Sequence, residues 1–182
     1  FQELSRKNLQ DWAETEKDLK KIFNLKNEVK RIEGYDISNI QGMEATGSMT
    51  VFENGMPNKN EYRKFKIHIS GRPDDIAMLK EVIQRRLKHI EWPLPQIMLI
   101  DGGKAQLNIA VSTIKQLKNS TIKTIALAKK KNELFVEGRP KPILLKNLSP
   151  KISYLILHIR DEAHRFALSY HHKLREKNLV RK

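Results

Sequence analysis

The stretch that decides the fold class reads Gln96-Ile97-Met98-Leu99-Ile100-Asp101-Gly102-Gly103-Lys104. Its apolar run, bounded by Pro95 and by Asp101, is typical of a short strand buried on both faces, as strands of a parallel sheet are. Helical spacing follows, with apolar side chains at Leu107, Ala110, Val111, Ile114 and Leu117. A buried strand that leads directly into a helix predicts an α/β domain.

Three strand-like segments precede this stretch. We predict strands over residues 29–38, 46–53 and 61–69, rich in β-branched and aromatic residues. Asn54-Gly55 predicts a hairpin turn between the second and the third. A helix is predicted from Pro73 onward, with Asp74 and Asp75 near its start, where negative charge suits the helix dipole.

The remaining segments complete an element order of β-β-β-α-β-α-β-α. We predict a leading amphipathic helix over residues 4–25, a strand over 121–128, short extended pieces at 133–136 and 143–145, and a long final helix that begins at Ser149-Pro150. This is the element order of the RNase H-like fold. We therefore expect a mixed five-stranded sheet flanked by helices. Residues 1–28 would form a leading helical segment and residues 29–182 the RNase H-like domain.

Composition points to a polyanionic partner. The 182 residues, enough for one domain, carry 35 lysines and arginines against 21 aspartates and glutamates, a formal charge of +14. DNA or RNA fits better than a membrane, because no apolar run approaches the roughly 18 residues of a membrane span and no signal peptide is visible. We expect a soluble, cytoplasmic protein. The absence of cysteine leaves only oxygen and nitrogen to bind a metal.

Two aspartates follow strand-like segments. Asp36 lies near the carboxyl end of the first predicted strand, and Asp101 directly follows the buried strand. Because ligands collect at the carboxyl ends of parallel strands, adjacent strands would bring both carboxylates together. Such oxygen ligands suit Mg²⁺ or Mn²⁺. Aspartate is also common in turns and helix caps, so each residue alone is a weak signal.

A histidine on the final helix is the third candidate. At about 100° per residue, His164 and Arg160 lie along one flank of that helix's apolar stripe. A neutral imidazole at the edge of the core can ligate a metal or accept a proton, although histidines that merely pack there are common.

Basic residues supply candidate DNA contacts. Gly102-Gly103-Lys104 opens a helix whose N–H groups, together with Lys104, could hold a phosphate, although the stretch is not a Walker loop. Arg160 and Arg165 are further candidates. So are Lys129, Lys130 and Lys131, and Arg85 and Arg86, although each of these could equally belong to a solvated face. For the tyrosines Tyr35, Tyr62 and Tyr170, core packing is favoured over base stacking.

Longer strings resemble one family. They are Arg31-Ile32-Glu33-Gly34-Tyr35-Asp36-Ile37-Ser38-Asn39-Ile40-Gln41-Gly42, Glu61-Tyr62-Arg63-Lys64-Phe65, Asp74-Asp75, Ile100-Asp101-Gly102-Gly103-Lys104-Ala105-Gln106-Leu107 and Arg160-Asp161-Glu162-Ala163-His164-Arg165-Phe166-Ala167. In order and spacing they resemble the C-terminal endonuclease half of the UvrC family. Asn39, Ala105 and Ile76 depart from the residues that are frequent there, and none of them is a catalytic candidate.

The resemblance implies a function. It implies a metal-dependent endonuclease of bacterial nucleotide excision repair that uses Mg²⁺ or Mn²⁺ and cuts damaged double-stranded DNA on the 5′ side of the lesion. The implied catalytic centre is Asp36, Asp101 and His164, with Asp75 also needed. UvrB, with UvrA upstream, would be the partner of the parent protein in the bacterial cytoplasm.

The rest of the chain leads to one further expectation, and two alternative functions remain open. The chain begins at Phe1 and contains neither a GIY-YIG nuclease nor a tandem helix-hairpin-helix, so we expect a monomeric fragment that alone binds DNA weakly and cuts poorly. One alternative is a catalytically silent module of the same fold that positions DNA. Another is a Piwi-type RNA-guided slicer, which the Gly-Gly-Lys string and the short length disfavour.

Overall fold

A computed structural model describes residues 2–38, 45–68, 74–119 and 121–180, with side chains described for 11–37, 45–68, 74–119 and 121–169. The strands are β1 (Arg31–Ser38), β2 (Thr46–Glu53), β3 (Met56–Pro57), β4 (Arg63–Lys66), β5 (Ile97–Asp101), β6 (Lys123–Ala128), β7 (Glu133–Val136) and β8 (Ile143–Leu144). The α-helices are α1 (Gln2–Phe23), α2 (Asp75–Lys88), α3 (Lys104–Gln116) and α4 (Pro150–Val180), and the short 3-10 helices are η1 (Lys59–Glu61) and η2 (Leu145–Asn147). None of the described helices is both long and apolar enough to cross a membrane.

All the described strands belong to one mixed sheet. Its order is β3-β2-β1-β5-β6-β7-β8, with β4 also paired to β2. The pairs β1–β5 and β5–β6 are parallel, and the others are antiparallel. The predicted α/β class with a leading helix is confirmed, but five strands was too few. The sheet widens because the chain turns back after β6, so that β7 and then β8 pair onto its edge.

The predicted hairpin turn is present but leads to a different strand. Asn54 and Gly55 have positive φ angles of 50° and 80°, and they join β2 to the short β3. The segment predicted as a strand over residues 61–69 is shorter than expected, because η1 ends at Glu61 and β4 covers only Arg63–Lys66. Ile69 lies outside the described residues.

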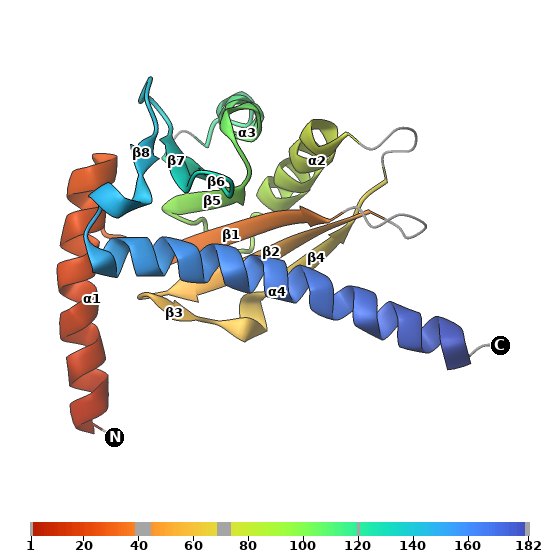
Figure 1. The fold of residues 1–182 in the computed structure, drawn as a ribbon, viewed down its shortest axis with the longest axis horizontal. Coiled ribbons are helices and arrows are strands. Elements are labelled where there is room, and N and C mark those ends of the chain that lie inside the picture. The colour runs from red at the N-terminus through yellow and green to blue at the C-terminus, as the bar shows by residue number, and fades with distance from the viewer. Residues whose placement is uncertain (1, 39–44, 69–73, 120, 181–182) are drawn as a thin grey trace.

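Helices cover both faces of the sheet. Figure 1 shows α2 and α3 on one face and the long α4 running across the other, with α1 beside the first turns of α4. Two apolar clusters fill the spaces between these layers. One packs α2 and α3 against the sheet around Leu79 and Met98. The other packs α1 and α4 around Phe23, Leu99 and Ile156.

A glycine lets α4 approach β1 closely. A Cβ atom on Gly34 would lie 2.6 Å from Cγ2 of Ile159 and 2.9 Å from Oγ1 of Thr50, both too close for real contacts. Only glycine therefore fits this position unless its neighbours shift. The close approach holds α4, and with it His164, against the strand that carries Asp36.

A buried ion pair lies on the opposite face of β1. Arg86, whose side chain has no solvent exposure, donates from a terminal nitrogen to Oε1 of Glu33 at 2.8 Å and from Nε to Oε2 at 3.1 Å. Nε of Arg31 donates to the same carboxylate at 2.9 Å, and the hydroxyl of Tyr35 donates at 2.6 Å. The expectation that Arg86 contacts phosphate is therefore wrong, because its buried guanidinium group is not accessible to a ligand. Arg85 is half-buried and pairs with Glu81 at 3.1 Å.

We predict that replacing Arg86 with methionine destabilises the fold. Arg86→Met leaves the buried Glu33 carboxylate with Arg31 as its remaining cation, and breaking a buried pair in this way costs about 3 kcal/mol. Urea unfolding measures the loss. Arg85→Met is the matched control, for which the loss of a pair that solvent still reaches should cost about 1 kcal/mol or less. Equal losses in the two variants would contradict this reading.

Candidate active site

The two aspartates singled out by their positions lie side by side. Parallel pairing of β1 with β5 matches Tyr35 to Ile100, so Asp36 and Asp101 follow at the same level. The side chains of both residues are nearly buried, with exposures of 10% and 9%. Apolar residues on both sides of each strand hold the backbone, while the strand ends place the carboxylates at the edge of the core.

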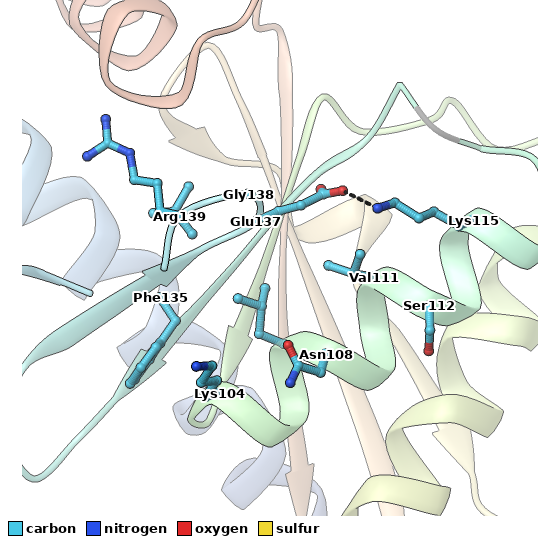
Figure 2. Close-up of a pocket in the computed structure, with 11 residues that line it drawn as sticks. Lys104, Asn108, Val111, Ser112, Lys115, Phe135, Glu137, Gly138 and Arg139 are labelled. Carbon is cyan, nitrogen blue, oxygen red and sulfur yellow. Dashed lines mark ion pairs between the residues drawn. The ribbon is translucent and has the colours of Figure 1, made fainter. Parts of the chain in front are cut away.

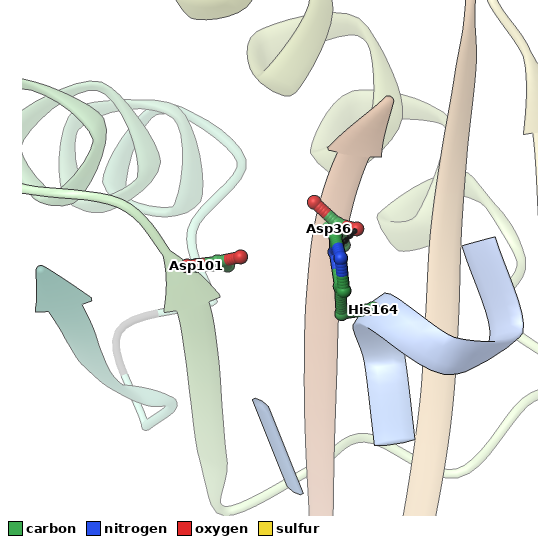
Figure 3. Close-up of side chains that lie close together, drawn as sticks. All are labelled: Asp36, Asp101 and His164. Atoms are coloured by element: carbon green, nitrogen blue, oxygen red, sulfur yellow. Dashed lines mark hydrogen bonds and ion pairs between the residues drawn. The ribbon is translucent and has the colours of Figure 1, made fainter. Parts of the chain in front are cut away.

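The final helix brings a histidine to the same place. Nδ1 of His164 lies 3.1 Å from Oδ2 of Asp36. One ligand atom from each of Asp36, Asp101 and His164 lies within 4.8 Å of the other two. Figure 3 shows the imidazole meeting the Asp36 carboxylate, with the Asp101 carboxylate directed toward both from the neighbouring strand. The His164 side chain is 46% exposed, so the cluster is accessible from the α4 side.

Electrostatics favour a cation at this cluster. Burial, and then the charge of Asp101, raise the pKa of Asp36, while His164 and Lys129 act in the opposite direction. Two nearby carboxylates in a poorly solvated place repel each other, and a cation between them removes that cost. The donor set of two carboxylate oxygens and one imidazole nitrogen fits Mg²⁺ or Mn²⁺. These residues therefore fit a divalent metal.

A lysine already contributes positive charge. Nζ of Lys129 lies 3.0 Å from Oδ2 of Asp101. Lys129 directly follows β6, whose parallel pairing matches Leu127 to Asp101. The sequence suggested this lysine only as a phosphate contact, because strand adjacency across the sheet is not visible in a charge run. Its neighbour Lys130 is exposed.

Asp75 is not brought into the cluster of Asp36, Asp101 and His164. It is the exposed first residue of α2. Asp74 caps that helix instead, accepting hydrogen bonds from the backbone N–H groups of Ile76 and Ala77 at 3.0 and 3.1 Å. Asp74, and not Asp75, is therefore the residue that caps α2.

The predicted DNA contacts on α4 already have partners. Arg160 donates to Oδ1 of Asp161 from two nitrogens, at 2.9 and 2.6 Å. Arg165 makes two hydrogen bonds of 2.7 Å to the carboxylate of Glu162. Either arginine would have to exchange this carboxylate for a phosphate. Lys104 is exposed at the first position of α3.

Two residues of the β2–β4 region hold α4 on either side of His164, a role the sequence reading missed. The hydroxyl of Tyr62 donates to Oε1 of Glu162 at 3.0 Å. Nζ of Lys64 donates to the backbone carbonyl of Phe166 at 2.6 Å and lies 4.4 Å from the centre of the Phe166 ring. The string Glu61-Tyr62-Arg63-Lys64-Phe65 marks this region in the sequence. Only the packing of α4 against it shows what Tyr62 and Lys64 bind. Tyr62 therefore packs against α4, the role that the sequence favours over base stacking.

We predict that Asp36→Asn stabilises the protein in the presence of a chelator. Because burial raises the pKa of Asp36, the wild type loses stability as pH rises from the ordinary value of 3.8 through the raised value. An amide does not ionise and so avoids the cost of a buried charge. The variant should therefore be more stable than the wild type near neutral pH, and this difference in stability should disappear in acid. Urea unfolding across this pH range measures the difference. Asp161→Asn is the exposed control, and a neutral-pH Asp36→Asn protein no more stable than wild type would contradict the assignment.

Comparison with known proteins places this geometry in a family. The model of the UvrC RNase H endonuclease domain matches residues 20–168. The UvrABC system protein C of Dictyoglomus thermophilum is 54% identical over 165 residues, which cover 90% of this chain and 27% of that protein. For the protein of the same name from Methanosphaera stadtmanae, the identity is 45%, over 87% of this chain and 28% of that protein. The chain thus spans little more than a quarter of these relatives.

Structural likeness agrees at the level of the fold. Endonuclease V of Ciona intestinalis, solved in complex with a 24mer DNA that contains an inosine followed by a ribo-adenosine, is 14% identical. Its TM-score is 0.53, over 92% of this chain and 99% of that chain. The matched family confirms the RNase H-like architecture expected from the element order. By its matched residues and its relatives, this chain belongs to the UvrC RNase H endonuclease domain family.

Proposed function

We propose that this chain is the metal-dependent DNA endonuclease domain of a UvrABC excision nuclease, hydrolysing a phosphodiester bond on the 5′ side of a lesion. The observation that carries the proposal is the convergence of Asp36, Asp101 and His164 in a chain of the UvrC family. The net charge of +14 suits a DNA substrate. Relatives that share 54% and 45% identity are named UvrABC system protein C, which supports a place in nucleotide excision repair.

The three side chains would share the work. Asp36 and Asp101 would hold a divalent cation, Mg²⁺ or Mn²⁺, which supplies charge neutralisation at the phosphate and a more acidic water. His164 would either ligate or accept a proton from the attacking water. If its Nδ1–H donates to Asp36, the other ring nitrogen is the acceptor. The exposed side of the imidazole suits an approach by substrate.

Basic residues would hold the substrate, and other proteins would deliver it. Lys104, Lys129, Lys130, Arg160 and Arg165 are the proposed phosphate contacts. The proposed substrate is damaged double-stranded DNA, and the proposed partner of the parent protein is UvrB, with UvrA acting earlier, in the bacterial cytoplasm. The chain alone would be a monomer with weak activity, since the relatives are more than three times its length.

Removal of Asp101 should abolish incision. In the intact parent protein with Mg²⁺ or Mn²⁺, Asp101→Ala should lower the rate of 5′ incision of a damaged duplex by at least about 100-fold, because a metal ligand is lost. Asp11→Ala, an exposed aspartate on α1, is the control and should cut normally. Asp75→Asn tests the fourth proposed catalytic residue in the same assay. If the Asp101→Ala protein cuts the 5′ side as well as wild type, the domain is a silent DNA-positioning module.

We expect a second ion to bind weakly without DNA. An imidazole carries no negative charge, whereas a third carboxylate in the place of His164 would add one, so the cluster attracts a second cation less strongly. Crystals soaked in Mn²⁺, with and without DNA, report the occupancy of each position. One ion without DNA and two with DNA is the expected result. Two fully occupied positions in the DNA-free crystal would contradict it.

A further inference from the structure

A hollow of about 400 Å³ lies between α3 and β7, on the face of the sheet that α3 covers. Its apolar wall includes Leu107 and Val111 on α3 and the ring of Phe135 on β7. Lys104, the first residue of α3, forms one end. Only Gly102 and Gly103 separate this lysine from Asp101 in the chain, so this end of the hollow lies near the carboxyl end of β5.

The sheet edge leaves the Phe135 ring accessible. The described pairing of β8 with β7 covers Glu133 and Leu134 and stops before Phe135. The residue opposite Phe135 on β6 is Ala126, which is too small to cover an aromatic ring. Phe135 packs only partly against the core. An aromatic face therefore lines an open hollow, where a flat ligand can stack on it.

Charge in the hollow is unequal at its two ends. At the far end Lys115 pairs with Glu137 at 3.6 Å, and Arg139 donates to the carbonyl of Ile22 at 3.0 Å. Among the residues that the structure describes, Lys104 has no ion-pair partner. Figure 2 shows Lys104 and Phe135 at the same end. A ligand that joins a flat apolar ring to an anion would satisfy both side chains.

We propose that this hollow binds one unstacked nucleotide of the DNA strand that is cut, with its base against Phe135 and a neighbouring phosphate at Lys104. The proposal rests on the proposed function, because the strand must also reach Asp36 and Asp101. A base inside a stacked duplex cannot enter a pocket of this kind, whereas an extruded or single-stranded base can. Stacking on one aromatic side chain typically contributes about 5-fold to 150-fold in affinity.

Fluorescence of a DNA strand tests the base contact. The 182-residue chain, in EDTA so that no cleavage occurs, is titrated into single-stranded oligonucleotides that carry 2-aminopurine at one position, whose emission falls when the base stacks. Wild type should quench the emission. Phe135→Leu should abolish the quenching and weaken binding at least about 5-fold. Asn108→Met, which narrows the hollow from its exposed rim without adding an aromatic ring, should also weaken the quenching.

Controls separate the hollow from binding elsewhere. Tyr154 is an aromatic residue with 70% exposure on α4, so Tyr154→Leu should leave quenching and affinity unchanged. Unchanged quenching in both hollow variants, or an equal loss in Tyr154→Leu, would overturn the proposal. A deoxynucleoside monophosphate that binds as tightly as the strand would also overturn it, because the hollow would then be a site for free nucleotides.

Salt dependence tests the phosphate contact. Removing one phosphate contact to a single strand should reduce the slope of log affinity against log salt by about 0.7. Lys104→Gln should show this reduction and keep the quenching. An unchanged slope would refute the role of Lys104. Since all these measurements are made without metal, they can succeed even if Asp101→Ala leaves incision intact, and they can fail while the nuclease assignment holds.

Discussion

Parallel pairing of β1 with β5 is the interaction on which the candidate site depends. It places Asp36 and Asp101 at one level. Because the two strands are parallel, the chain must return across one face of the sheet to the start of β5, and α2 makes this return. α4 then closes the site from the other face, where Gly34 permits its close approach. A shift of one residue in this pairing would turn one carboxylate away from the other, since successive side chains point to opposite faces.

Alternation along β1 gives two carboxylates opposite electrostatic surroundings. Glu33 faces α2, where Arg86 and Arg31 neutralise it and make it part of the scaffold. Asp36 faces α4, where Asp101 and burial both oppose its charge and raise its pKa. The neutralised group stabilises the fold, whereas the opposed group gains from binding a cation. Such a cost to stability is common where a fold carries a reactive site.

The basic residues around the cluster differ in the partners that they already have. Lys129, which directly follows β6, contacts Asp101, and Lys104 is the first residue of α3 at one end of the hollow. The two α4 arginines, like Lys129, are paired with acidic residues, which lie one and three positions away in the chain. The net positive charge of the sequence predicts an anionic partner, but it does not show which basic residues are available to bind one.

The sequence by itself determined the α/β class, the leading and final helices, and the positions of Asp36 and Asp101 at strand ends, because hydrophobic periodicity and turn residues are local signals. Only the tertiary structure decided the rest. It buried Arg86 against Glu33, left Asp75 outside the cluster, and joined β7 and β8 to the sheet. Each of these depends on contacts between segments far apart in the chain, and no local pattern encodes which distant carboxylate an arginine meets.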